Sequence, residues 1–108
     1  MNEESALAAF ASISNQTRLR ILKTLVAAGA DGMTAGDIAE SVAASPSRAS
    51  FHLTHLSDAG LINSTRQARK IIYAIDFGSV GALVRYLIED CCQNNETVRS
   101  CCGIESAC

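Results

Sequence analysis

Apolar residues recur three and four positions apart through the first half of the chain, and this spacing predicts four short amphipathic helices. The residues before these stripes support the prediction, because serine and threonine can accept the free backbone N–H groups of a first helical turn. Pro46 fits the first position of the fourth helix, where no backbone donor is needed. The expected helices cover residues 5–13, 15–28, 35–42 and 46–59, and their expected N-caps include Ser14, Thr34 and Ser45.

The pattern changes after Gly60. Residues 61–66 and 70–75 are rich in β-branched and aromatic side chains, which predicts two strands joined by residues 67–69. Gly78 and Ser79 then open a last, long helix whose apolar positions again repeat at helical spacing. Its stripe consists of Val80, Leu83, Val84, Leu87, Ile88 and Cys91. A stripe this apolar is not expected to face water, so the last helix is predicted to form the seam of a dimer.

The order of these elements predicts the fold class. Two short helices joined by a turn of a few residues, as expected at 35–42 and 46–59, form a helix-turn-helix. A basic hairpin that follows directly is typical of a wing. We therefore expect a mainly α fold with a small β-hairpin, a dimeric winged helix-turn-helix. It would occupy residues 1–92, and residues 93–108 would form a mobile, cysteine-rich tail.

Composition narrows the class of protein. The chain has 108 residues, 48% apolar and 19% charged, which is ordinary for one small folded domain. No apolar run approaches the roughly 20 residues that a membrane span needs, and the acidic N-terminus lacks the basic segment of a secretion signal. We expect a cytoplasmic protein without a membrane partner. A domain this small has little room for an enzyme cleft beside its core, so we interpret it as a binding module and not an enzyme.

Charge is distributed unevenly, although the net charge is only −2. Residues 45–70 are mainly basic and the residues after Lys70 are mainly acidic; a local basic patch can bind phosphates on an acidic protein. In a winged helix-turn-helix, the second helix enters the major groove and the wing contacts the backbone or the minor groove. The expected DNA-binding residues are Ser45, Ser47, Arg48, Ser50, Phe51, Thr54 and His55 of that helix, and Arg66, Arg69 and Lys70 of the wing.

Individual side chains in this set suggest particular roles. Arg48 can reach guanine or a phosphate, and Phe51 can touch a thymine methyl group. His52 lies between the apolar stripe and the groove face, so we expect it to be half-buried and hydrogen-bonded and not to be a metal ligand.

The five cysteines all lie at or after position 91. A disulfide scaffold is not expected, because the chain lacks a secretion signal and the number of cysteines is odd. A pure sulfur cluster without histidine selects soft metal centres. Two alternatives stay open: a thiol–disulfide switch, and a four-thiolate zinc or cadmium site. The candidate metal ligands are Cys91, Cys92, Cys101 and Cys102, with Cys108 as a further thiol.

Two other classes of protein compete with a DNA-binding regulator. A small thiol reductase could use the cysteine pairs if Arg99 lowered a thiol pKa, but the chain lacks the Cys-x-x-Cys motif that redox folds use. A dimeric interaction module without DNA affinity is the third class.

Two segments together resemble the ArsR family of winged-helix metalloregulatory repressors. Residues 14–22 (SNQTRLRIL) are similar to the family's second helix, and residues 45–53 (SPSRASFHL) with 56–61 (LSDAGL) to its recognition helix. The resemblance covers roughly residues 5–90. It implies a homodimer built on the first and last helices, double-stranded operator DNA as partner, and release from the operator when an inducer binds.

Departures from the family pattern indicate which inducer the resemblance implies. Residues 34–37 lack the Cys-x-Cys pair of many arsenic-responsive members, and residues 80–90 lack the histidine of zinc-sensing members. The second helix lacks the cysteine of persulfide-sensing members. What remains resembles members with a vicinal cysteine pair at the end of the last helix and a third cysteine just beyond, which sense trivalent arsenic or antimony.

This resemblance implies As(III) or Sb(III) as inducer, without an organic cofactor, bound by Cys91, Cys92 and either Cys101 or Cys102. The residues do not distinguish As(III), Sb(III) and a methylated arsenical as the inducer. They also do not show whether the cysteine ligands come from one subunit or from both. Because Cys91 continues the apolar stripe, a ligand bond there would act directly on the dimer seam.

Overall fold

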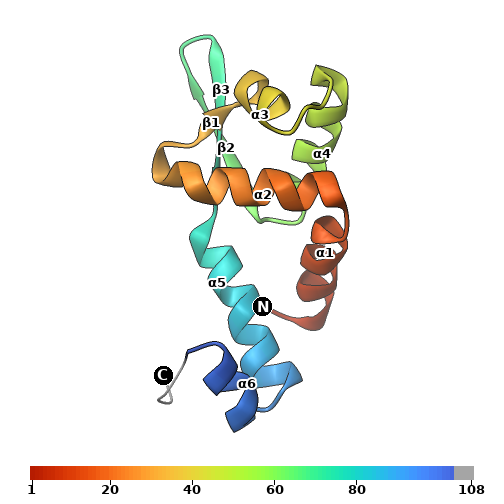
Figure 1. Cartoon of the computed structure of the whole chain (residues 1–108), viewed down its shortest axis with the longest axis vertical. Helices are drawn as coiled ribbons and strands as arrows, with labels where there is room; N and C mark the ends of the chain where they lie inside the picture. The colour runs from red at the N-terminus through yellow and green to blue at the C-terminus, as the bar shows by residue number, and fades with distance from the viewer. Residues whose placement is uncertain (104–108) are drawn as a thin grey trace.

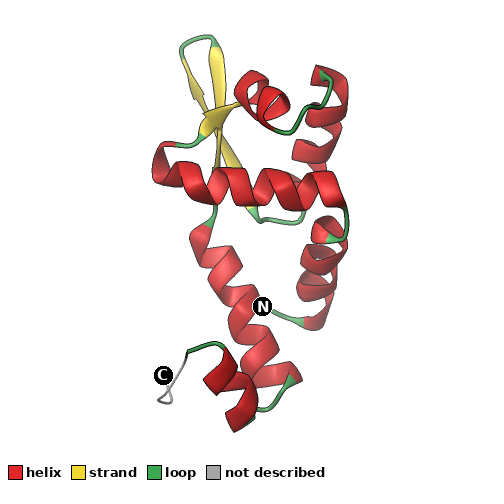
Figure 2. Ribbon diagram, viewed as in Figure 1, coloured by secondary structure: helices red, strands yellow, loops and turns green. Residues whose placement is uncertain are grey.

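The computed structural model describes residues 1–103, a mainly helical chain with one small antiparallel sheet (Figures 1 and 2). The predicted winged helix-turn-helix fold is confirmed. In chain order the elements are α1 (Glu3–Ile13), α2 (Gln16–Ala28), the 3₁₀ turn η1 (Gly29–Asp31), β1 (Met33–Thr34), α3 (Ala35–Ser41), α4 (Pro46–Asp58), β2 (Ile62–Gln67), β3 (Lys70–Ile75), α5 (Phe77–Arg85), the π-helical segment η2 (Tyr86–Cys91) and α6 (Glu96–Cys101).

Side-chain caps define where the first helices begin. Thr34 and Ser45 cap α3 and α4 through their hydroxyl groups, as the sequence predicts. The cap of α2 is Asn15 and not Ser14: the Asn15 side-chain oxygen accepts the N–H of Arg18 at 3.0 Å, while Ser14 ends α1. Asparagine and serine are about equally good N-caps, so residue types could not choose between these neighbours.

The core lies where α1, α2 and α4 meet the sheet. Ile21 and Leu25 of α2 and Leu53 and Leu56 of α4 are completely buried there. These four side chains come from two helices at helical spacing, which is why the apolar pattern predicted both elements. We call the part of the chain organised around this core the body (residues 3–75).

The sheet has one strand more than the sequence predicts. β2 and β3 form the expected hairpin, with Gln67 opposite Lys70 across its turn. β1 pairs antiparallel with the other edge of β3, so the strand order is β1-β3-β2. β1 has only two residues, Met33 and Thr34, and so short a strand leaves no periodic signal in the sequence.

The last predicted helix changes its geometry partway along. α5 is α-helical, capped by Asp76, but η2 continues it as a π-helix in which the N–H of Cys92 donates to the carbonyl of Leu87, five residues back, at 2.9 Å. A π turn holds more residues than an α turn, so it rotates the positions that follow. Cys91 is exposed, as are Val84 and Leu87 of the same apolar stripe, and Cys92 is half-buried. The place of Cys91 on a dimer seam stays a prediction.

A sixth helix follows where the sequence predicts a mobile tail. A tight turn from Cys92 to Asn95 reverses the chain; its central residues Gln93 and Asn94 have φ of 51° and 57°, and the N–H of Asn95 donates to the Cys92 carbonyl at 3.0 Å. Asn95 then caps α6 by accepting two backbone N–H groups. The short, polar α6 has no apolar periodicity that could have predicted it.

The C-terminal elements extend away from the body (Figure 1). The molecule measures 46 × 23 × 22 Å with a radius of gyration of 15.2 Å, against about 13 Å for a compact domain of this length. We call residues 77–103 the C-terminal arm. Within residues 1–103, no helix is long and apolar enough to cross a lipid bilayer.

Candidate nucleic-acid interface and thiol site

α4 has one buried face and one exposed face. Ala49, Leu53 and Leu56 pack into the core, together with His52. The residues expected to contact DNA lie on the other face, where all are exposed except the half-buried His55. Because the buried face anchors the helix, its polar side remains open along its whole length. These open positions are Ser45, Ser47, Arg48, Ser50, Phe51, Thr54 and His55.

The N-terminus of α4 presents hydrogen-bonding groups to the outside. The Ser45 hydroxyl accepts the N–H of Arg48 at 3.3 Å and lies 3.4 Å from the Ser47 hydroxyl. Free N–H groups and the positive end of the helix dipole at this point favour an anion such as a phosphate. The exposed Arg48 side chain adds a full positive charge to the same turn.

Phe51 is a large apolar side chain that the body leaves uncovered, with 62% of its surface exposed. Its ring makes edge contacts with His52 and His55, at centroid distances of 5.4 and 6.1 Å. The two histidines therefore hold an apolar side chain outward on an otherwise polar helix face. Such a group suits contact with a thymine methyl group in the major groove.

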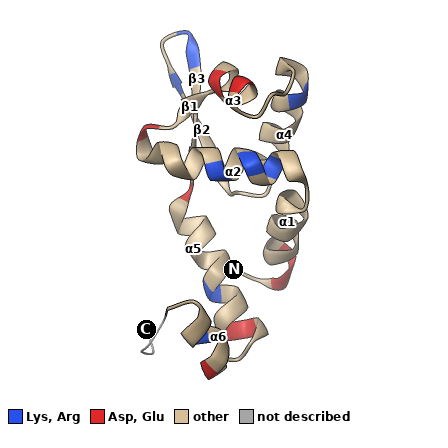
Figure 3. Ribbon diagram, viewed as in Figure 1, with Lys and Arg blue, Asp and Glu red and all other residues tan. Residues whose placement is uncertain are grey.

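The wing places the second group of basic side chains near the tip of the β2–β3 hairpin. Arg66, Arg69 and Lys70 are all exposed, and Arg66 Nε donates to the carbonyl of Ala68 at 3.4 Å. Figure 3 shows basic residues on the wing and on α4, and further basic residues along α2. Two of those, Arg20 and Lys23, are exposed, and neither is among the residues predicted from the sequence to contact DNA.

The vicinal cysteines lie at the point where the arm turns back on itself. The Cys92 thiol has a pKa raised above its ordinary value by burial, by the negative charge and a hydrogen bond of Cys91, and by the charge of Cys102. The structure thus brings Cys102 into electrostatic range of the vicinal pair, whereas Cys101 does not contribute to this shift. The idea that Arg99 lowers a thiol pKa is not supported at Cys92. Cys108 lies outside the described residues.

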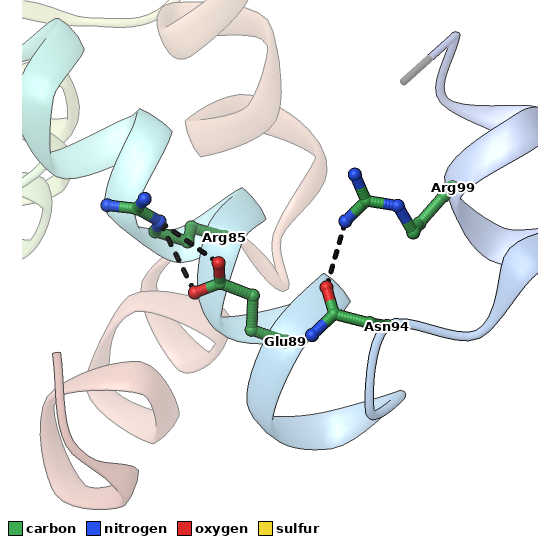
Figure 4. Close-up of polar contacts among 4 residues, drawn as sticks. All are labelled: Arg85, Glu89, Asn94 and Arg99. Atoms are coloured by element: carbon green, nitrogen blue, oxygen red, sulfur yellow. Dashed lines mark hydrogen bonds and ion pairs between the residues drawn. The ribbon is translucent and has the colours of Figure 1, made fainter. Parts of the chain in front are cut away.

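Polar contacts hold the two halves of the arm together (Figure 4). Arg99 of α6 donates to the side-chain oxygen of Asn94 at 2.8 Å, which ties α6 to the turn. Arg85 and Glu89 form an ion pair of 3.3 Å across the junction of α5 and η2. Among residues 1–103, however, no three Cys, His, Asp or Glu side chains lie close enough together to hold a metal ion. The cysteine sulfurs are suitable ligands for a soft ion. Binding such an ion would require the thiols to move closer together than they are in this structure.

Sequence comparison identifies the class of protein. A family model described as a helix-turn-helix domain matches residues 13–65, which run from the end of α1 into β2. The HTH-type transcriptional regulator YgaV of Escherichia coli K12 is 37% identical over 84 residues, which are 78% of this chain and 83% of YgaV. The chain belongs to the helix-turn-helix transcriptional regulators.

Solved structures agree on the architecture of this regulator. An ArsR-like transcriptional regulator from Rhodococcus sp. RHA1 superposes with a TM-score of 0.74 at 23% identity, covering 97% of this chain and 96% of the other. The homodimeric winged helix-turn-helix domain of Mb0332 from Mycobacterium bovis, a possible ArsR-family regulator, superposes with a TM-score of 0.64 at 22% identity over 85% of each chain. The regulator therefore has the winged-helix fold of ArsR-type proteins.

Proposed function

We propose that this regulator is a homodimeric repressor that binds operator DNA through α4 and the wing and leaves it when As(III) or Sb(III) binds the arm's thiols. The observation that carries the proposal is the electrostatic environment of Cys92: the charges of Cys91 and Cys102 raise the pKa of its thiol, at the end of an arm with exposed apolar side chains. A ligand bound there acts on the arm and leaves the body intact.

The exposed face of α4 supports the DNA-binding part. Its small hydroxyl side chains allow close approach to a groove, while Arg48 and the wing supply positive charge for phosphates. The distance between the two recognition helices of a dimer must match one turn of DNA, about 34–36 Å. A modest displacement of the two subunits therefore disrupts both half-sites together.

Exposed apolar side chains support the homodimer. Leu7 on α1 and Val84 on α5 are 59% and 44% exposed, and Leu87 is also exposed on η2. Apolar groups gathered on two helices mark an interaction surface. The homodimeric domain of Mb0332 provides an example of a dimer with this fold. We therefore assign the dimer surface to α1 and to the arm.

Thiol chemistry supports a soft inducer. Thiolates are the ligands that soft centres prefer, and a trivalent metalloid takes three of them. The charge interaction of Cys102 with Cys92 makes Cys102 the proposed third ligand, in preference to Cys101. The raised pKa of Cys92 lowers the fraction of thiolate for oxidation and for ligand binding alike, so the redox switch is distinguished by experiment.

The experiment measures fluorescence anisotropy of a labelled duplex that carries the promoter of the gene encoding this regulator. Addition of As(III) or Sb(III) is expected to release the wild-type protein from this duplex. Cys91→Ser, Cys92→Ser and Cys102→Ser are expected to bind the duplex normally and to ignore the metalloid. Cys101→Ser is the matched control, because Cys101 ends α6 directly before Cys102, and it is expected to respond as the wild type does.

The same titration also tests the other candidate inducers. Release by Zn(II) or Cd(II) at lower concentration than by the metalloids would favour a four-thiolate metal site. Release by diamide that dithiothreitol reverses would favour the disulfide switch. If Cys91→Ser and Cys92→Ser proteins both still leave the duplex when metalloid is added, the proposed site is wrong. If the wild type does not bind the duplex, the operator assignment is wrong.

A further inference from the structure

A buried arginine joins three helices of the body. Only 9% of the surface of Arg18, in α2, is exposed, although its guanidinium carries a permanent charge. Its Nε donates to the carbonyl of Ser12, near the end of α1, at 2.6 Å. Its Nη1 contacts Nδ1 of His52, in α4, at 3.1 Å. Ser12 is itself completely buried, so one side chain bridges α1 and α4 inside the protein.

The contact between the Arg18 guanidinium and the His52 ring determines the protonation state of that ring. A guanidinium has donors and no acceptor, so Nδ1 of His52 must accept the hydrogen bond. The ring is then neutral and carries its proton on Nε2. The Ser12 carbonyl belongs to the last turn of α1, where carbonyls lack helical partners and a cation is favourable. Arg18 therefore donates one hydrogen bond to a carbonyl at the end of α1 through Nε and another to the His52 imidazole through Nη1.

We propose that Arg18 and His52 act as a positioning pair that holds the recognition helix α4 against α1 and α2, and that DNA binding requires His52 to be neutral. His52 lies on the buried side of α4, between the exposed Phe51 and the core residue Leu53. A shift at this point moves the groove-facing residues as one body. The inference rests on the DNA-binding part of the proposed function and on nothing about the inducer.

Protonation would convert this contact from attraction to repulsion. A second proton on His52 removes the acceptor and places two cations side by side in a buried place. Burial lowers the pKa of His52, and the charges of Arg18, Arg48 and His55 lower it further. α1 contributes the Ser12 carbonyl, and Asp37 and Glu40 of the neighbouring α3 are exposed.

The sign of the pH effect follows from this lowered pKa. The folded protein with α4 in place resists a proton that a free imidazole accepts below about pH 6.5. In the folded protein the ring therefore stays neutral at pH 6.5, and the pair loses its effect as the pH falls through the lowered pKa of His52. Because one proton is involved in each subunit, the affinity of a dimer for DNA falls by at most about tenfold per pH unit for each His52 ring that is protonated.

The first test is a pH profile of binding to the promoter duplex at constant salt, without metalloid. The wild type is expected to keep its affinity at pH 6.5 and to lose it as the pH falls through the lowered pKa of His52. His52→Leu removes the acceptor and is expected to bind about tenfold more weakly at pH 7.5, because the buried guanidinium keeps an unpaired donor. His52→Asn retains an acceptor that does not titrate. It is expected to restore affinity at pH 7.5 relative to His52→Leu and to abolish the loss below pH 6.5.

His55 is the matched control, because it lies one turn along the same helix and is the other histidine of the chain. Its ring makes no contact with the Arg18 guanidinium in this structure, so His55→Gln is expected to retain the loss of affinity in acid. An unchanged acid loss in His52→Asn would overturn the proposal, and so would loss of the effect in His55→Gln. A wild type that binds no duplex at any pH would instead refute the operator assignment.

The second test is an NMR titration of the untagged protein, which has two histidine rings to resolve. The pKa of His52 is expected to lie below the ordinary value of a free imidazole. Arg18→Met removes the charge beside the ring and is expected to raise the pKa of His52 towards its free value, with His55 as internal reference. Because Arg18→Met can destabilise the fold, the His52→Asn pH profile decides the proposal independently. An unaltered His52 pKa in a folded Arg18→Met protein would contradict the pairing.

Discussion

The body and the C-terminal arm differ in how their apolar side chains are buried and in the regularity of their helices. In the body, α2 and α4 bury Ile21 and Leu53 against each other and against the sheet. The body also leaves apolar side chains exposed, among them Leu7 on α1 and Phe51 on α4, on the faces proposed for a second subunit and for DNA. In the arm, Val84 and Leu87 are exposed as well, and the helix changes to π geometry. π segments tend to occur at functional sites. The body has a buried core of its own, and the arm has the features of a segment that a partner or a ligand completes.

The largest effect is expected from a cavity in the body. Leu53→Ala removes a completely buried side chain and should lower the free energy of unfolding by about 2–5 kcal/mol. Val84→Ala, on the arm, is the matched control and should change the unfolding of the isolated chain by roughly 0.5 kcal/mol or less, because its site is exposed. Urea denaturation of both proteins at low concentration measures the difference. Equal losses would remove the distinction between body and arm.

A smaller effect is expected at the groove face of the body. Arg48→Ala should weaken operator binding by about 1–3 kcal/mol if Arg48 contacts a base. The dimer should be unaffected, since Arg48 is exposed on α4, away from the arm. Anisotropy at fixed salt gives the affinity, and light scattering gives the mass in solution. Unchanged affinity would place Arg48 outside the interface, and a change in mass would mean that α4 and the arm are not independent.

The arm should respond to pH differently from the body. A raised pKa keeps Cys92 protonated at neutral pH, and As(III) is present there as the neutral trihydroxide. Each thiol proton then leaves with a hydroxide as water, so binding releases no net proton. Affinity for As(III) in the absence of DNA should therefore stay nearly constant from pH 6.5 to 7.5. Calorimetry of the free protein measures this without interference from DNA binding, and a steep rise with pH would contradict capture by protonated thiols.

The smallest effect is expected on the wing, which contacts phosphate and not bases in the proposed complex. Lys70→Ala should reduce the slope of log K against log salt by about 1 and should weaken binding similarly on different sequences. Glu89→Gln, on the arm, is the matched comparison and should leave the slope unaltered. An unchanged slope in Lys70→Ala would show that this side chain does not touch the DNA backbone.

The sequence predictions were more accurate for the body than for the C-terminal arm. Helices 35–42 and 46–59 were predicted almost to the residue, because Thr34 and Ser45 cap them locally and their apolar stripes meet one core. His52 was expected to be half-buried and hydrogen-bonded. The hydrogen bond is confirmed, but the side chain is buried, with 6% of its surface exposed, because its partner Arg18 lies inside the body. Arg18 lies 34 residues earlier and carries no sequence signal for this contact. The predicted DNA-binding positions are exposed or half-exposed as expected, and their contacts with DNA remain predictions.

In the arm, local signals were insufficient. The apolar spacing from Val80 to Leu87 predicted a helix correctly, but a regular helical repeat could not reveal that η2 has π geometry or that Cys92 is the more buried of the vicinal cysteines. α6 was not predicted at all, because its six residues depend on the Asn95 cap and on the preceding turn more than on their own pattern. The assignment of Cys91, Cys92, Cys101 and Cys102 as ligands stays a prediction.

Sequence alone determined the features that depend on neighbours within a few positions: the helical repeats, the caps, the hairpin and the concentration of cysteines after residue 90. Those interactions span one or two turns, so residue type and spacing specify them. Tertiary structure decided the features that join distant segments. These are the pairing of β1 with β3, the bridge of Arg18 between Ser12 and His52, and the approach of Cys102 to Cys92. Each depends on where the chain returns in space, and no local pattern encodes that return.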